Sequence, residues 1–177
     1  MKAFWRQGYE GTSLSDLTSA TGLNRPSLYA AFGNKEALFR KALDRYADTH
    51  MAFMRSALEE PTAREAVEAL LRGFIASATD PRTPAGCLTV GAALTSGPAA
   101  DAIRTELTAR RRAGEANLRA RLRRAQSSGD LPPDASPSDL ARFINTLTQG
   151  IAIQAADGAT RDQLNRVVDL ALRHWPS

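Results

Sequence analysis

Apolar residues recur three and four positions apart along almost the whole chain, and no stretch alternates convincingly between apolar and polar at every second residue. The first pattern predicts amphipathic helices, and the second would be needed for half-buried strands. We therefore expect an all-α fold. The predicted elements are roughly nine helices, over residues 1–8, 14–20, 26–32, 35–58, 63–78, 87–94, 99–127, 138–156 and 161–174.

Glycine and proline mark the ends of these predicted helices. Pro61 stops the long fourth helix, and Gly97 and Pro98 stop the sixth. The last two helices are joined by a tight turn at Asp157 and Gly158. Both are apolar over broad faces, so we expect them to bury surplus apolar surface against a second copy of the chain. The candidates for the seam of this homodimer are Leu140, Ile144, Leu147, Val168 and Trp175.

The stretch from Gly8 to Leu38 carries the clearest local signals. Ser13 can cap the start of the second predicted helix, and Gly22 suits its end, where a left-handed conformation is needed. Asn24 can cap the third helix, and Pro26 falls in its first turn, where a missing N–H is tolerated. Two short helices joined by a turn that contains glycine form a helix-turn-helix. The second helix of such a pair lies in the major groove of DNA.

The same stretch is similar to the DNA-binding head of the TetR family of bacterial transcriptional repressors. The shared string is G-Y-x-G-T-S-L-x-D-L-T-x-A-T-G-L-N-R-P-S-L-Y-x-x-F-x-N-K-E-A-L, from Gly8 to Leu38. Elsewhere the resemblance is one of architecture, with long helices of which the last two commonly dimerise. It implies a homodimer with a DNA-binding head and a helical body that binds a small-molecule effector. Because Met1 begins within the first helix, we expect that helix to be shorter than is usual in the family.

The resemblance also implies DNA contacts at individual residues. Arg25 and Ser27 match base-reading positions, and Arg25 can fork onto the O6 and N7 atoms of guanine. Tyr29 and Lys35 match contacts to phosphates. The DNA-binding residues implied in this way are Thr12, Ser13, Ser15, Asn24, Arg25, Pro26, Ser27, Tyr29, Ala30 and Lys35.

The short side chains of this set suggest limited reading of bases. Thr12 and Ser13 open the second helix, where hydroxyl and N–H groups suit a phosphate. Ser15 and Ala30 reach few base edges, so the shape of the DNA is expected to matter. Two plainer interpretations stay open. A helix pair inside a bundle can show the same spacing, although the long shared string argues against it, and Tyr29 can be a half-buried packing residue.

The charge of the chain favours a polyanionic partner, here double-stranded DNA. The 177 residues carry a formal charge of +4, and almost all basic residues are arginine, whose planar guanidinium suits phosphate. Residues 1–58 hold eight basic and five acidic side chains, a balance of +3, whereas the remaining 15 basic and 14 acidic side chains give +1. We interpret the arginine-rich run over 110–124 as a solvated helix face rather than a second nucleic-acid surface.

The composition excludes several other classes of protein. Cys87 is the single cysteine, and His50 and His174 lie far apart, so we expect no metal and no cofactor. No convergent acid, base or nucleophile is visible, so we assign no catalytic residues and do not expect an enzyme. No apolar run is long enough to span a bilayer, and residues 1–12 lack the apolar core of a signal peptide. We therefore expect a cytoplasmic protein without membrane contact.

Cys87 follows a loop that contains Pro84 and Gly86, and no Lys, Arg or His lies within three residues to activate its thiol. We interpret it as a buried residue that is dispensable for DNA binding. The alternative is a sensor of oxidants or electrophiles.

The sequence predicts two domains, a helix-turn-helix domain over 1–46 and an effector-binding and dimerisation domain over 47–177. We expect a mostly apolar cavity in the second, and a hydrophobic or aromatic effector that releases the protein from a palindromic operator. Its expected lining consists of Phe53, Leu70, Phe74, Leu94, Ile103 and Leu107. The hypothesis is therefore a ligand-responsive repressor, and the alternative is an architectural or protein-interaction DNA-binding protein without an effector.

Overall fold

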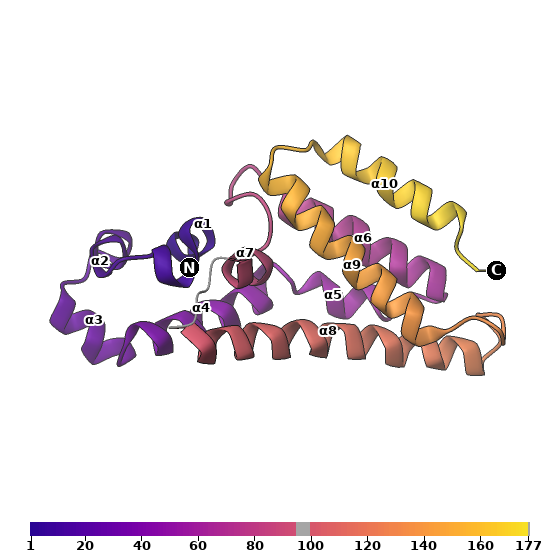
Figure 1. Ribbon diagram of the computed structural model, residues 1–177, viewed down its shortest axis with the longest axis horizontal. Helices are drawn as coiled ribbons and strands as arrows, with labels where there is room; N and C mark the ends of the chain where they lie inside the picture. Colours follow the sequence, from indigo (N-terminus) through magenta and orange to yellow (C-terminus); the bar gives the residue numbers. More distant parts are fainter. Residues whose placement is uncertain (95–99, 177) are drawn as a thin grey trace.

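The computed structural model describes residues 1–94 and 100–176, and all regular structure in this range is helical, as the sequence predicts (Figure 1). The expected helix stop at Gly97 and Pro98 lies outside the described residues. The described part contains ten helices: α1 (Lys2–Gly11), α2 (Leu14–Thr21), α3 (Arg25–Phe32), α4 (Lys35–Thr49), α5 (Phe53–Ala57), α6 (Ala63–Ala78), α7 (Leu88–Leu94), α8 (Asp101–Ser127), α9 (Pro137–Ala156) and α10 (Arg161–Arg173).

The tenth helix arises because the predicted helix over 35–58 is divided into α4 and α5. The carbonyl oxygen of Tyr46 accepts the N–H of His50 at 2.9 Å and also the N–H of Met51 at 3.2 Å. The regular ladder of hydrogen bonds is lost at that point, and the chain turns before α5 begins. Neither glycine nor proline marks this break, so the helical periodicity alone did not reveal it.

Arg121 of α8 is an exception to our expectation that the arginine-rich run over 110–124 forms a solvated helix face. Its side chain is buried, and its guanidinium donates to the carbonyl oxygens of Leu58, Glu60 and Pro61 at 3.0, 2.9 and 3.1 Å. These carbonyls lie just after α5, where the helix leaves its acceptors unsatisfied. Arg121 therefore holds the segment between α5 and α6 against α8.

The first helix continues to Gly11 instead of stopping at Gly8. Gly8 has a φ of 70° and kinks α1, a conformation that glycine adopts at little cost. The short extension beyond the kink brings the chain to the start of α2.

Helices α1 to α3 and the first half of α4 enclose the small core of the head. Phe4, Leu17, Leu28 and Phe39 are buried there, and the rings of Phe4 and Phe39 meet edge to face with centroids 4.9 Å apart. Figure 1 shows α2 and α3 at the end of the molecule opposite the C-terminus. The head is thus carried on α4, which continues into the body.

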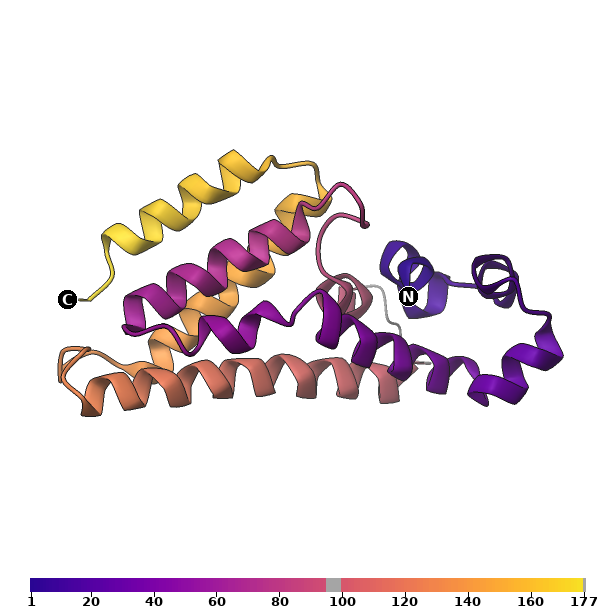
Figure 2. The ribbon, with the colours of Figure 1, turned by 180° about the vertical axis from the view of Figure 1, so that it is seen from behind.

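The body is built from α5 to α10. Helix α9 packs against α6 and α8, and α10 lies on α6 and α9 (Figures 1 and 2). Helix α8, with 27 residues, runs along one side of the body. Helix α7 contacts α1 and α4 as well as α8 and α9, so it joins the body to the head.

The C-terminal pair α9 and α10 runs antiparallel, as expected (Figure 1). Three of the five residues predicted for a dimer seam are nevertheless buried in the single chain: Ile144, Val168 and Trp175 have exposures of 1%, 0% and 9%. Phe143, Val167 and Leu170 are instead 47%, 40% and 51% exposed on the outer face. The inward and outward faces of these helices lie one residue apart, and the periodicity could not separate them.

Candidate DNA-binding head and effector cavity

Side-chain caps fix the N-termini of the two helices in the helix-turn-helix. Ser13 Oγ accepts the N–H of Asp16 at 3.1 Å, and the Asp16 carboxylate accepts the N–H of Ser13 at 2.8 Å. Hydrogen bonds from the side chain and backbone of Ser13 lower the pKa of Asp16. Gly22, at a φ of 70°, ends α2, and Asn24 Oδ1 accepts the N–H of Ser27 at 2.9 Å to begin α3. The predicted caps are all present.

Helix α3 presents most of its surface outward. Leu28 is its buried residue, and Tyr29 is 41% exposed. The other residues predicted to contact DNA in and before this helix are also exposed: Asn24, Arg25, Pro26, Ser27 and Ala30. The structure therefore brings these six predicted residues onto an open helix.

Thr12 does not have the role that the resemblance implied. Its side chain is fully buried, and its hydroxyl donates to the carbonyl oxygen of Gly8 at 2.6 Å. The kink at Gly8 leaves that carbonyl outside the regular helical ladder, and Thr12 satisfies it. The hydroxyl is therefore used within the head and is not available to a phosphate.

A change of Thr12 to valine is expected to affect folding and not the contact with DNA. Valine keeps the shape but leaves the Gly8 carbonyl without its hydroxyl donor, which should lower the free energy of unfolding by about 1–2 kcal/mol. Thr12→Ser, which keeps the hydroxyl, serves as the control. Urea denaturation measures the loss, and an operator titration of the folded variant should match that of the unchanged protein. If Thr12→Val instead weakens the operator complex and leaves the free energy of unfolding unchanged, the Thr12 hydroxyl does contact a phosphate.

The other polar residues predicted to contact DNA near α2 and α4 differ in whether their side chains are free to do so. Ser15 is exposed, whereas the Ser13 hydroxyl is used in its cap. The Lys35 ammonium lies 4.8 Å from the ring centroid of Tyr9 and donates to the carbonyl of Glu10 at 3.5 Å. Partial burial is the main cause of the lowered pKa of Lys35. Without DNA, Lys35 is thus held against the end of α1.

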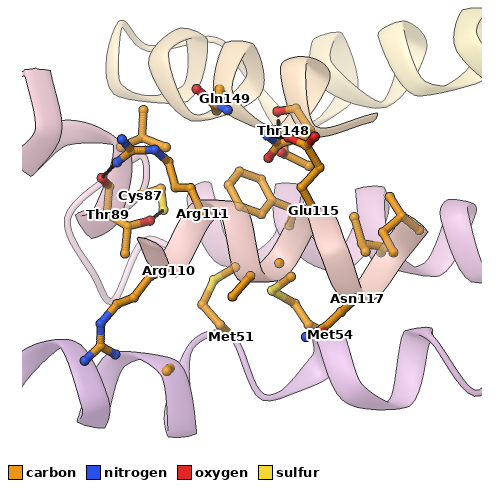
Figure 3. A pocket seen from close by; sticks show the side chains of 18 of the residues that line it. Met51, Met54, Cys87, Thr89, Arg110, Arg111, Glu115, Asn117, Thr148 and Gln149 are labelled. Atoms are coloured by element: carbon orange, nitrogen blue, oxygen red, sulfur yellow. Dashed lines mark hydrogen bonds between the residues drawn. The ribbon is translucent and has the colours of Figure 1, made fainter. Parts of the chain in front are cut away.

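A cavity of about 360 Å³ lies in the body between α4, α5, α6, α7, α8 and α9 (Figure 3). This volume is within the range of small-molecule sites. Its apolar lining is Leu43, Tyr46, Ala47, Met51, Met54, Leu58, Leu70, Phe74, Cys87, Val90, Ala113, Gly114, Leu118 and Ile144. Its polar lining is Arg55, Thr89, Arg110, Arg111, Glu115, Asn117, Asn145, Thr148 and Gln149.

Two of the residues predicted to line a cavity, Leu70 and Phe74, do so. Phe53, Ile103 and Leu107 do not. Phe53 packs against Gly73, where a Cβ atom would collide with its ring, and Ile103 and Leu107 are almost completely buried in the core at the start of α8. The side chain of Leu94 lies outside the described part of the chain.

The polar part of the lining was missed by sequence reasoning. Arg111 donates to the carbonyl of Thr89 at 3.0 Å, and Glu115 accepts from Asn145 at 2.9 Å. In Figure 3, Thr148 and Gln149 approach from α9 and Arg111 from α8. The signal was the charge density of α8, but periodicity cannot show which arginines of a helix point inward. The lining is mostly apolar, as expected, but this side of it is polar.

A chain of contacts links the cavity to the head. Tyr46 and Cys87 both line the cavity, and the Tyr46 hydroxyl donates to Cys87 Sγ at 3.4 Å. On its other side, the Tyr46 ring meets the indole of Trp5 from α1 edge to face, with centroids 4.8 Å apart. Burial is the largest cause of the raised pKa of Tyr46, so its hydroxyl stays protonated and donates. The cavity wall therefore touches the first helix of the head through one side chain.

Comparison with known proteins assigns the chain to a family. The profile described as bacterial regulatory proteins, tetR family, matches residues 1–42, and the profile described as tetracyclin repressor-like, C-terminal domain, matches residues 61–170. The chain belongs to the TetR family. Like the other members of this family, it is a helix-turn-helix transcriptional regulator and not an enzyme.

Full-length relatives support this membership. The HTH-type transcriptional repressor ComR of Escherichia coli (strain K12) is 39% identical over 99% of this chain and 85% of its own length. The uncharacterized regulator YezE of Bacillus subtilis (strain 168) is 30% identical over 97% of this chain and 90% of its own. A solved cysteine mutant of the TetR-family regulator CifR, in complex with a 26-base-pair operator, has a TM-score of 0.95 and 45% identity, covering 99% of this chain and 92% of that one.

The described residues offer neither a membrane span nor a metal cluster. No helix among them has both the length and the apolarity that are needed to cross a bilayer. Within the same residues, no group of three or more His, Cys, Asp or Glu side chains is placed to hold a metal ion.

Proposed function

We propose that this TetR-family chain is a cytoplasmic, ligand-responsive repressor. It binds a palindromic operator as a homodimer, and a small molecule in the cavity releases it. Residues 1–46 form the DNA-binding domain, and residues 47–177 form the effector-binding and dimerisation domain. In the head, α3 enters the major groove with Arg25 and Ser27 at base edges, while Tyr29 and Lys35 contact phosphates.

Helix α4 is the observation that carries this proposal. It follows α3 directly and contributes Leu43, Tyr46 and Ala47 to the cavity wall. A ligand that displaces these side chains therefore acts on the same helix that positions α3. The ligand need only bind better to a state in which the two heads have the wrong separation for successive major grooves. A DNA-binding protein without an effector would have no use for a cavity on this helix, so that alternative is not favoured.

Tyr46 provides a second support for the coupling. Its hydroxyl contacts Cys87 at the entrance to α7, its ring contacts Trp5, and α7 itself packs on α1. A ligand that moves α7 or Tyr46 thus acts on both α1 and α4. Because α1 and α4 then move together, the head can rotate as a unit relative to the body.

The operator can be identified by sequencing DNA that the protein enriches from a random pool. We expect palindromic sites whose half-sites are centred about one helical turn apart, ~34–36 Å. A thermal-shift screen of small molecules, followed by operator titration with each hit, then finds the effector. Enrichment of asymmetric single sites, or hits that raise the melting temperature without weakening the operator complex, would contradict the proposal.

Replacement of Cys87 by serine is expected to leave operator affinity unchanged. The residue is buried in the body, and a serine hydroxyl can still accept the hydrogen bond from Tyr46. Fluorescence anisotropy with labelled operator measures the affinity of both proteins. The same titration after treatment with an oxidant tests the alternative role, because release of the unchanged protein but not of Cys87→Ser would show that the thiol senses oxidation.

A further inference from the structure

The cavity carries more positive than negative charge. Three arginines line it, Arg55, Arg110 and Arg111, against a single carboxylate, Glu115. These four groups are not equivalent, because most of them already have a partner or are open to water. Their partners determine which one can recognise a ligand.

Arg110 is neutralised by groups outside the cavity. Its guanidinium contacts Asp44 of α4 at 2.6 Å and Glu106 of α8 at 2.7 Å. Glu115 is likewise paired, with Arg142 of α9 at 2.8 Å, and it also accepts from Asn145. Neither the Arg110 cation nor the Glu115 anion is therefore left for a ligand.

Arg111 is the half-buried cation of the cavity that lacks a counter-ion. It donates to two neutral oxygens, the Thr89 carbonyl at 3.0 Å and Thr108 Oγ1 at 3.2 Å. No carboxylate in the described part of the chain lies within ion-pair distance of it. Desolvation is the largest cause of the lowered pKa of Arg111, and the neighbouring Cys87 offsets it only in part. Arg55, the other unpaired arginine, is exposed, so water and salt screen it.

The two contacts of Arg111 also fix its position. Thr89 belongs to α7 and Thr108 to α8, so the guanidinium is held at the junction of these helices. Figure 3 shows Arg111 near Thr89 and Cys87, with Gln149 of α9 above it, while Arg110 points away toward α4. The remaining N–H groups of the guanidinium are suited to a planar anion, because a carboxylate accepts two parallel hydrogen bonds.

The opposite side of the cavity is apolar. Met51 and Met54 approach it from the α4–α5 side (Figure 3). Leu70 and Phe74 of α6 also line the cavity. Methionine adapts to ligands of different outline, so this side suits an alkyl or phenyl group without strict demands on its shape. The cavity therefore has a cation at one end and an apolar surface at the other, so it suits a ligand with an anionic group and an apolar body.

We propose that the effector is an amphipathic small organic acid, whose carboxylate pairs with Arg111 and whose alkyl or aryl body packs on Met51, Met54 and Phe74. This inference rests on the proposed function and refines the expected hydrophobic effector by adding an anionic head. The ligand ties α7 and α8 together through Arg111 and at the same time presses on α4 and α5.

Calorimetric titration with matched probes tests this inference. Octanoate and phenylbutanoate are compared with the alcohols and the primary amines of the same carbon skeletons. We expect each carboxylate to bind the full-length dimer about tenfold or more tightly than its alcohol, and the amines to bind least. Equal binding of acid and alcohol, or failure of both carboxylates to bind, overturns the inference.

Variants at Arg111 identify the cation. Arg111→Met should remove the preference for carboxylate over alcohol and leave alcohol binding within about twofold. Arg111→Lys, which keeps the charge, should retain part of the preference, and it replaces the methionine variant if that variant does not fold. Arg112→Met, at an exposed neighbouring position, is the matched control and should change nothing. A preference that is undiminished in Arg111→Met, or in Arg111→Lys where only that variant folds, overturns the assignment.

Operator titration separates this inference from the function on which it rests. If neutral or cationic hits from a thermal-shift screen release the operator while the carboxylates do not, the repressor function holds and the organic acid is wrong. If no palindromic operator is bound, the proposed function itself fails. Release by octanoate or phenylbutanoate that is lost in Arg111→Met supports both.

Discussion

A variant with glutamate at both Phe143 and Leu170 is expected to sediment as a monomer and to lose most of its affinity for the operator. These two side chains are about half exposed and line one shallow groove between α9 and α10, together with Leu147, Val167 and Trp175. Exposed apolar side chains that gather on one face in this way mark a candidate protein–protein contact surface. Charges placed in its centre would have to be buried without partners, at a cost of several kcal/mol each.

The loss of operator affinity should be about 100-fold or more, because a monomer engages one half-site and loses the gain from joint binding of two. Sedimentation velocity at micromolar concentration and operator titration measure the two effects. Ala120→Glu, at an exposed position of α8, introduces a charge away from this face and should remain dimeric. A double variant that stays dimeric would place the interface elsewhere.

Replacement of Arg25 by alanine is expected to relax sequence specificity. Arg25 is exposed at the start of α3, next to the cap that fixes this helix. Loss of a forked hydrogen-bond pair with guanine should weaken the operator by roughly 1–3 kcal/mol per half-site, and a dimer loses it twice. Affinity for random DNA should fall much less. If both affinities fall by the same factor, α3 does not read that base through Arg25.

Lys35→Ala provides the contrast with Arg25→Ala. A lysine on a phosphate carries no sequence information, so this variant should weaken all DNA sequences alike. It should also reduce the salt dependence of log affinity by about one unit for each phosphate that is no longer neutralised. Because Lys35 rests against Tyr9 in the free protein, it must leave that ring to reach a phosphate. If Lys35→Ala changes neither the affinity nor its salt dependence, Lys35 does not contact a phosphate.

The head could be predicted from the sequence because its determinants are local. Ser13, Gly22 and Asn24 act on residues within three or four positions, and this range is what a cap or a turn signal describes. Thr12 shows the limit even there. Its hydroxyl looked available for a phosphate, but the kink at Gly8 turns a backbone carbonyl toward it.

The body could be predicted as a set of helices with a cavity between them, but most of the residues that line the cavity could not. Its cavity joins residues from six helices, and contacts such as that of Tyr46 with Cys87 depend on how those helices pack. Periodicity identifies an apolar stripe, but it does not distinguish a filled core, where Ile103 and Leu107 lie, from a cavity wall, where Leu70 lies. Arg121 and Arg111 likewise belong to one arginine-rich run, yet Arg121 holds the segment between α5 and α6 and Arg111 faces the cavity.

The position of Trp5 allows its intrinsic fluorescence to report on both the cavity and the head. The chain has two tryptophans, Trp5 and Trp175, and the indole of Trp5 is packed edge-on against the rings of Tyr46 and His50 at 4.8 and 5.0 Å. Its Nε1 is buried without a hydrogen-bond partner in the described part of the chain, so its emission belongs to an apolar environment. With Trp175 changed to phenylalanine, the remaining fluorescence arises between the cavity wall and the head. Filling of the cavity and movement of the head can then be followed in real time, without a dye and without DNA.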